Sequence, residues 1–180
     1  MLFKFPLSGG LYRCDAGDLG GGRVIGSEWL VQVQPGWHIK RGTFEAKLFW
    51  GPEYQHHRLS PDDPENTLRG GAFGLRFSPE LWDEPPDKTM VAADASLSTI
   101  AGGSSARVGV GWKVHDMFCA GPEGQVYRGD GYSPWRLGAH LTRFKTGNAE
   151  WSAAGGWSVD TNSRSSPYLR LGFMQRVGGD

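Results

Sequence analysis

Cysteine, net charge and long hydrophobic runs are all scarce in this sequence of 180 residues. Its two cysteines, Cys14 and Cys119, are too few for a disulfide framework or for a zinc site of their own, so we expect both to be unpaired. The 19 basic and 19 acidic residues cancel, which excludes nucleic-acid binding driven by excess positive charge. The apolar runs cover only a handful of residues, and this excludes a transmembrane helix.

Helix signals are scarce too, because glycine and proline recur too often for long helical segments. Glycine contributes 28 residues, about twice its usual share of about 7%, and Trp, Tyr and Phe contribute 8, 5 and 9. What recurs is alternation: within 29–39 the odd positions are mostly apolar and the even positions mostly polar or small. Successive side chains of a strand point to opposite faces, so the pattern predicts strands with one apolar and one polar face.

The alternation predicts ten strands, at 2–13, 23–39, 43–56, 70–82, 88–100, 105–115, 117–128, 134–144, 149–158 and 167–176. Several exceed the 5–6 residues usual in soluble sheets and suit tilted membrane-spanning strands of about 9–11 residues. Longer or more polar loops are expected at 14–22, 57–69, 101–104, 129–133 and 159–166. Tighter turns are expected at 40–42, 83–87, 115–116 and 145–148. Long connections at one end and short ones at the other are typical of outer-membrane β-barrels.

Four prolines fall on the apolar face within these strands: Pro35, Pro52, Pro79 and Pro122. Each removes a hydrogen bond from the ladder, which a central strand should not tolerate. We therefore expect the prolines to mark bulges or bends in the sheet.

The two faces distinguish a membrane barrel from a soluble one, because a soluble barrel points its apolar face inward and a membrane barrel points it to lipid. The apolar face carries tryptophans near strand ends, as an interfacial girdle would. These membrane-interface aromatics are Trp29, Trp37, Trp135, Trp151 and Trp157. The polar face is rich in glycine, which relieves crowding inside a narrow barrel. We predict one domain over 1–180, an all-β, antiparallel, up-and-down transmembrane β-barrel.

On this interpretation the lumen collects charged side chains of both signs, which must be paired or solvated. The predicted luminal network consists of Glu45, Lys47, Glu53, Arg76, Glu80, Asp94, Arg107, Lys113, Glu123, Arg136, His140, Glu150 and Arg170. The balance of signs favours a cross-linked interior or a thin aqueous path over an ion-selective pore.

Several motifs, taken together in their order and spacing, resemble a known family. They are Pro61-Asp62-Asp63-Pro64-Glu65-Asn66 with Arg69-Gly70, Gly74-Leu75-Arg76, Glu80-Leu81-Trp82, Ala95-Ser96-Leu97-Ser98-Thr99, Gly121-Pro122-Glu123, Trp135-Arg136-Leu137-Gly138-Ala139-His140 and Glu150-Trp151-Ser152-Ala153-Ala154-Gly155-Gly156-Trp157. From about residue 2 to residue 176 the chain is similar to the cellulose biosynthesis protein BcsS family of proteobacteria. The resemblance implies an outer-membrane barrel encoded near cellulose synthase genes, with a role in making, exporting or retaining the polysaccharide and no catalytic residues to carry over.

The N-terminus departs from this family, whose members usually begin with a signal peptide and further strands. Met1-Leu2-Phe3-Lys4-Phe5-Pro6 lacks the basic stretch and long apolar run of a targeting signal and resembles mid-barrel sequence. We hypothesise a truncated or misassigned start, so that two further strands would make twelve in the complete protein. The final residues, 176–180, also lack the terminal aromatic residue common in outer-membrane barrels.

Two groups of residues suggest catalysis, each with a simpler alternative. Glu53 and Glu123 occupy the same place in a repeated Gly-Pro-Glu motif. Paired carboxylates can cleave a glycosidic bond, but structural glutamates paired with luminal arginines are the simpler interpretation. His140, Glu150 and Ser158 lie on neighbouring predicted strands, as in a barrel enzyme with its site at the rim, yet no nucleophile motif is present.

A metal site is also weighed at His56 and His57, beside the acidic residues of 61–66. Neighbours in a strand point to opposite faces, so only one histidine would face a given site, and we favour a polar loop. We expect no metal and no cofactor.

The residues and the resemblance together predict a non-enzymatic outer-membrane accessory of bacterial cellulose biosynthesis or secretion, and thus of exopolysaccharide and biofilm. The expected partners are outer-membrane lipid and either cellulose or components of the cellulose synthase complex, with no nucleic acid. Two alternatives stay open: a lipid- or glycan-modifying outer-membrane barrel enzyme, and a soluble lipocalin-like ligand-binding barrel.

Overall fold

The computed structural model describes residues 1–15, 23–60, 69–86, 88–114, 117–129, 133–147, 149–161 and 163–175. Nearly all of this part of the chain is β-strand, and the one helical element within it is a short 3₁₀ turn, η1 (Ile100–Gly102). Within these ranges no helix is long and apolar enough to cross a membrane.

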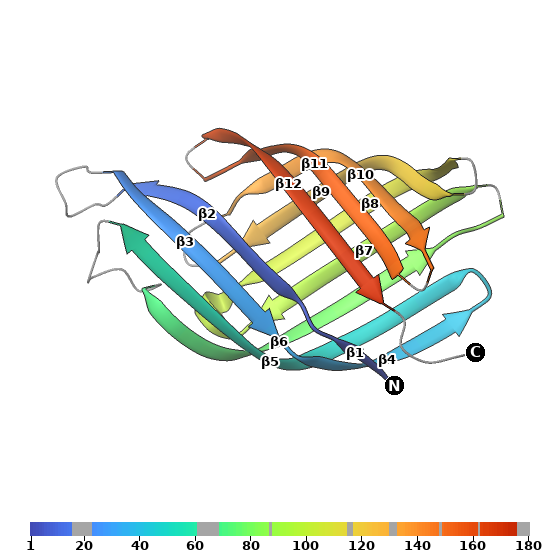
Figure 1. Ribbon diagram of the computed structural model, residues 1–180, viewed down its shortest axis with the longest axis horizontal. Coiled ribbons are helices and arrows are strands. Elements are labelled where there is room, and N and C mark those ends of the chain that lie inside the picture. Colours follow the sequence, from blue (N-terminus) through green and yellow to red (C-terminus); the bar gives the residue numbers. More distant parts are fainter. Residues whose placement is uncertain are drawn as a thin grey trace.

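The strands form one antiparallel sheet that follows the chain order closely (Figure 1). They are β1 (Leu2–Lys4), β2 (Leu7–Asp15), β3 (Arg23–Gln32), β4 (Gln34–Arg41), β5 (Phe44–Ser60), β6 (Gly70–Asp83), β7 (Thr89–Ser98), β8 (Ser104–Val114), β9 (Phe118–Arg128), β10 (Trp135–Thr146), β11 (Ala149–Val159) and β12 (Ser165–Gln175). From β5 onward each strand pairs with the next, so the all-β, antiparallel, up-and-down prediction is confirmed.

The sheet curls into a half-barrel, with β1 and β2 at one edge and β12 at the other (Figure 1). Among the described residues β12 forms a ladder with β11, and neither β1 nor β2 pairs with it. The strand ends that the longer connections join lie toward the left of Figure 1, and the strand ends that the short turns join lie at the opposite end, as the alternating loop lengths predict.

Prolines divide two of the ten predicted strands, and this is why twelve strands are observed. The segment 2–13 divides into β1 and β2 at Pro6, and 23–39 divides into β3 and β4 at Val33. Pro6, between β1 and β2, and Pro52 of β5 lie on the two sides of this break, and neither has an N–H to donate. Their carbonyl oxygens accept from the backbone N–H of Gln32 and Val33, at 3.0 and 3.1 Å. The register is the same on both sides, so the two extra strands are pieces of the ten and not an added hairpin.

Pro79 and Pro122 likewise leave gaps in their ladders without shifting the register, whereas Pro35 pairs within a continuous ladder opposite β1. The register shift that the described ladders do contain lies in β10, opposite β11. Here Arg143 has a φ of 64°, in the left-handed region. The extra residue of this bulge brings two successive side chains, Thr142 and Arg143, toward the inside of the sheet, an arrangement that simple alternation does not predict.

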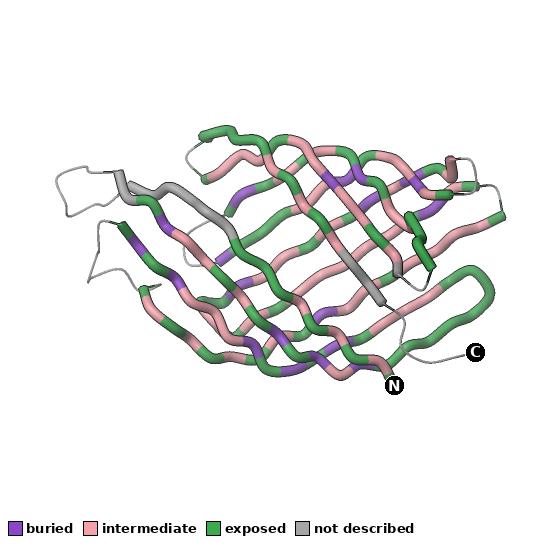
Figure 2. Tube along the Cα trace, viewed as in Figure 1, coloured by how far each residue is buried: buried purple, intermediate pink, exposed green. Residues whose placement is uncertain are grey.

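The outside of the curled sheet is apolar and its inside is polar. Figure 2 shows exposed residues alternating with buried or half-buried ones along many of the strands. Contacts between strands that are not neighbours identify the inside: Lys4 of β1 pairs with Glu80 of β6, and Arg170 of β12 pairs with Glu123 of β9. The buried apolar residues of the described chain are Phe49, Leu59, Met90, Cys119 and Ala154. The buried polar ones are Gln32, Gln34, Glu53, His57, Ser78, Glu123 and His140. This is the reverse of the inward apolar face that a soluble lipocalin-like barrel needs.

Glycines on the inner face allow neighbouring strands to approach closely where the sheet bends. A Cβ atom at Gly51 would overlap the carbonyl oxygen of Val33, and one at Gly121 would overlap the carbonyl oxygen of Val110. Both glycines begin the repeated Gly-Pro-Glu motif. The motif therefore combines a close approach, a gap in the ladder and, at its third residue, an inward-facing glutamate.

We predict that Gly121→Ala destabilises the protein by about 1–3 kcal/mol, because the added methyl group has to displace backbone atoms. The matched control is Gly124→Ala on the same strand, where the nearest atom to an added Cβ lies at 4.0 Å. Denaturant unfolding of both variants in the same detergent measures the difference. Equal midpoints for the two variants would show that the close approach at Gly121 is not tight.

Candidate functional site

Every member of the predicted luminal network lies on the inner face and is buried or half-buried. The five predicted interface tryptophans all point outward and are exposed. Of these, Trp29 lies away from the strand ends and packs beside Tyr54, with ring centroids 5.1 Å apart. Cys119 is buried and forms no disulfide, and the side chain of Cys14 lies outside the described part.

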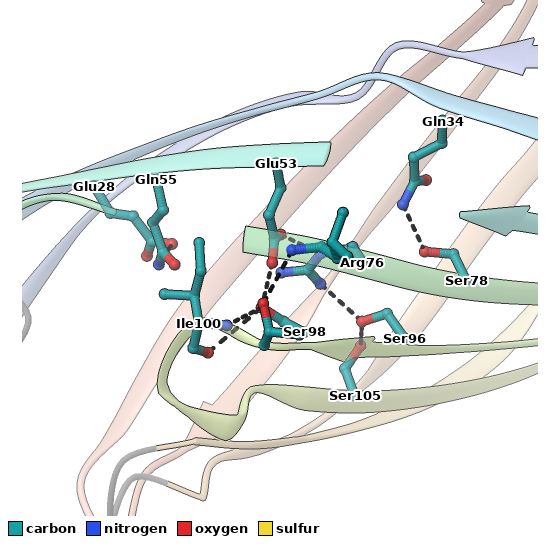
Figure 3. A network of polar contacts seen from close by, with 12 residues as sticks. Glu28, Gln34, Glu53, Gln55, Arg76, Ser78, Ser96, Ser98, Ile100 and Ser105 are labelled. Carbon is teal, nitrogen blue, oxygen red and sulfur yellow. Dashed lines mark hydrogen bonds and ion pairs between the residues drawn. The ribbon is translucent and has the colours of Figure 1, made fainter. Parts of the chain in front are cut away.

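The first charged centre of the lumen surrounds Glu53 of β5 (Figure 3). Its side chain is 0% exposed, and its Oε2 accepts from Nε of Arg76 at 2.6 Å. The hydroxyl of Ser98 donates to the other carboxylate oxygen. Arg76 also donates to Ser96, whose hydroxyl lies 2.9 Å from that of Ser105. One buried carboxylate thus links β5, β6, β7 and β8.

The second centre surrounds Glu123 of β9, whose side chain is 1% exposed. Its Oε2 accepts from Arg170 at 2.5 Å and from Arg107 at 3.4 Å, and the hydroxyl of Tyr168 donates to Oε1 at 3.1 Å. Arg107 also pairs with Asp94 of β7. This cluster joins β7, β8 and β9 to the edge strand β12 across the inside of the sheet.

Neither glutamate presents an exposed, unpaired carboxylate in the described structure. Glu53 and Glu123 are enclosed by protein, and their carboxylate oxygens already accept hydrogen bonds from neighbouring side chains. A glycosidase needs both carboxylates to reach the scissile bond. The arrangement agrees with the simpler interpretation of glutamates paired with luminal arginines.

The residues proposed for an enzymatic rim do not come together. His140 lies over Gly109 and Gly111, with Nε2 3.2 Å from the carbonyl oxygen of Val110. Glu150 is opposite Lys145 beside a short turn, and Ser158 is at the other end of the same strand, opposite Arg136. Eight residues of strand separate Glu150 from Ser158, which at about 3.3 Å per residue is about 26 Å. The predicted proximity of these residues is therefore wrong.

His56 and His57 point to opposite faces. The ring of His56 packs beside Trp29 on the outside, at 5.6 Å between centroids. His57 is buried inside, with Nε2 2.7 Å from the side-chain nitrogen of Gln55. The acidic residues of 61–66 lie outside the described residues, and within the described part no three His, Cys, Asp or Glu side chains are grouped to hold a metal.

Two adjoining cavities occupy the short-turn end of the lumen. The outer one, of about 270 Å³, is lined by Lys40, Gly42, Thr43, Glu45, Lys47, Trp82, Glu84, Arg143 and Glu150. The inner one, of about 140 Å³, shares Glu45, Lys47 and Trp82 and extends to Asp94, Arg107 and His140. Together they form a polar recess with a single tryptophan in its wall.

The predicted luminal network does not include Lys40, Trp82, Glu84 or Arg143, which also line this recess. Trp82 stands at an even position of a strand whose even face is polar, so parity alone was a usable signal. Arg143 faces the lumen only because of the bulge, and nothing in the sequence pattern indicates it. Its guanidinium pairs with Glu84, beyond the end of β6, and lies 5.9 Å from the ring centroid of Trp82.

Buried polar side chains occupy the lumen beyond the recess. The largest fully buried side chains of the described chain include Gln34, Glu53 and Glu123, from three different strands, and Met90, which lines the inner cavity. Gln34 donates to Ser78 at 3.2 Å across the inner face. Of the two interiors expected from the sequence, the described structure has the cross-linked one.

A curled antiparallel sheet with an apolar outside and an interior of arginine–carboxylate pairs defines a protein of the β-barrel class. The chain belongs to the family described as cellulose biosynthesis protein BcsS, whose model matches residues 1–177. Membership of this family assigns the protein a role in cellulose biosynthesis. Comparison with curated proteins and with solved structures found no match.

We predict that Glu123→Gln lowers the free energy of unfolding by about 2–3 kcal/mol, because it leaves the half-buried guanidinium groups of Arg107 and Arg170 without their shared carboxylate, while Arg107 keeps its pair with Asp94. Lys40→Ala is the control, since it removes the exposed pair Lys40–Glu45, which should contribute at most about 1 kcal/mol. Unfolding curves of both variants provide the comparison. A loss for Glu123→Gln no larger than that of the control would contradict the central role of this cluster.

Proposed function

We propose that this protein is an outer-membrane β-barrel that acts as a non-catalytic accessory of bacterial cellulose biosynthesis, at the stage of secretion or retention of the polymer. The observation that carries the proposal is the apolar outer face of the sheet. The outward side chains of Phe73, Leu169 and Leu171 are 84%, 76% and 74% exposed. Soluble monomers rarely expose contiguous apolar patches larger than a few hundred Å², and lipid would cover this surface.

The lengths of the strands support the same environment. β11 and β12 each contain 11 residues. At about 3.3 Å per residue such a strand is about 36 Å long, and a tilt of about 40° reduces its vertical span to about 28 Å. This height covers the apolar band of about 25 Å found on outer-membrane barrels.

The two ends of the sheet differ in the way that outer-membrane barrels do. Short turns connect β4 to β5 and β10 to β11, and the longer connections lie at the opposite end (Figure 1). Outer-membrane barrels place short turns in the periplasm and long loops outside the cell. We therefore orient the recess beside Trp82 toward the periplasm.

In a bilayer the open edges would have to be joined, because an unpaired backbone group in hydrocarbon costs several kcal/mol. β2 runs toward the long-loop end and β12 runs away from it (Figure 1). Antiparallel edges can pair directly or through an even number of further strands. A closed barrel is therefore part of the proposal.

A passive role is favoured by the contents of the lumen. The described interior contains fully buried and paired side chains such as Glu53 and Glu123, and we infer that the polysaccharide does not thread through it. The residues considered for catalysis are either enclosed or far apart. We infer that the protein handles the polymer at its ends or organises the secretion machinery beside it.

We predict that Leu171→Arg destabilises the barrel by about 2–4 kcal/mol, because an arginine in the middle of the lipid-facing band is costly. The control is Ser165→Arg on the same face of the same strand, at its loop end, where the cost falls to about 0–1 kcal/mol. Refolding into lipid vesicles and denaturant titration measure both. In a water-facing sheet both changes would stay within about 0.5 kcal/mol, and that result would refute the membrane assignment.

Deleting the gene tests the accessory role. We expect less cellulose at the cell surface, measured by dye binding, while cellulose synthase activity in isolated inner membranes is unchanged. The protein itself should fractionate with outer-membrane markers and require detergent for release. Unaltered surface cellulose, or recovery of the folded protein in the aqueous fraction, would contradict the proposal.

A further inference from the structure

We propose that the recess at the short-turn end binds the end of a β-1,4-glucan chain, with Trp82 as the surface on which a sugar ring stacks. The inference rests on the proposed function, which supplies the polymer. It adds a site, a ligand class and the residues that would hold it.

The position of Trp82 favours stacking against a sugar ring. It is a tryptophan on the inner face, whereas the five interface tryptophans, Trp50 and Trp112 are all exposed on the outside. It lines both cavities, so its indole is reached from the outer and the inner part of the recess. A large apolar ring in a polar lumen is unfavourable for packing alone, but it suits the apolar face of a pyranose ring.

The balance of charge around the Trp82 ring favours a neutral ligand. The outer cavity has three cationic side chains, Lys40, Lys47 and Arg143, and three anionic ones, Glu45, Glu84 and Glu150. An ionic ligand would call for an excess of the opposite sign. Interleaved donors and acceptors with no net charge match a neutral ligand whose hydroxyl groups both donate and accept hydrogen bonds.

Ion pairs already hold the polar groups of the recess in place. Lys40 pairs with Glu45 at 3.0 Å, and Arg143 pairs with Glu84. The bulge in β10 directs Arg143 inward, where its guanidinium approaches Trp82. Groups fixed before binding lose less conformational entropy when a ligand arrives, so the recess is preorganised for recognition.

The size and depth of the recess favour a chain end over a threaded polymer. Its outer cavity of about 270 Å³ is close to the lower limit of ligand pockets, about 300–1,000 Å³. Met90 lines the inner cavity, and beyond that cavity the fully buried Glu53 and Glu123 belong to the cross-linked interior. On the proposed orientation the recess opens to the periplasm, the compartment that a glucan made at the inner membrane has to cross.

The test is calorimetric titration of the purified full chain, in detergent micelles, with cellohexaose and, in parallel, with maltohexaose. We expect saturable binding of cellohexaose and at least tenfold weaker binding of the α-linked maltohexaose. Trp82→Leu should weaken cellohexaose binding by about tenfold, the size of a lost aromatic contact. Trp82→Phe should retain most of it. Trp50→Leu, on the outer face, should bind as the wild type does.

A second variant, Lys40→Ala, guards against misfolding, because Lys40 lies at the exposed rim and its loss should leave the barrel intact while weakening cellohexaose binding two- to fivefold. Circular dichroism confirms the fold of each variant. No binding by the folded wild type would overturn the inference, and so would equal binding of the two oligosaccharides or unchanged binding by Trp82→Leu. None of these results would alter the outcome of membrane fractionation or gene deletion, so the proposed function stands or falls separately.

Discussion

The pairing of buried carboxylates with arginines is the interaction on which the rest of this structure depends. The outer face is largely apolar, so many charged side chains of the strands lie on the inner face, where an unpaired buried charge would be very costly. Glu53 and Glu123 solve this by each accepting hydrogen bonds from arginine and hydroxyl groups of other strands. Those from Ser98, Arg170 and Tyr168 connect strands that share no ladder, and they hold the curled sheet together from within in place of an apolar core.

The same pairing determines where function can occur. The middle of the lumen is cross-linked around Glu53 and Glu123, whose carboxylates are enclosed by protein and paired with arginines. Open space is found instead at the short-turn end, where Trp82 and Arg143 meet charged groups of both signs. A barrel whose middle is closed and whose end is recessed suits recognition of a ligand at its mouth.

Much of the fold could be predicted because alternation has a direct physical cause. Residues such as Leu169 and Arg170 point to opposite faces whatever the rest of the chain does, so parity predicted the inner and outer faces correctly. The positions of the prolines predicted irregularity but not its form, since gaps at Pro52 and Pro122 leave the register intact. The grouping of His140, Glu150 and Ser158 was wrong because Glu150 and Ser158 lie at opposite ends of one extended strand, and neighbours in sequence order are not neighbours in space along a strand.

By itself the sequence determined the strands, their two faces, the excess of small residues inside and the membership of the cellulose biosynthesis family. Only the tertiary structure decided which charges meet, that Glu123 shares Arg107 with Asp94 and reaches Arg170 across the lumen, and that a bulge brings Arg143 to Trp82. The reason is that alternation is a property of one strand, whereas pairing across the lumen depends on register, bulges and the curvature of the whole sheet, none of which a single strand encodes.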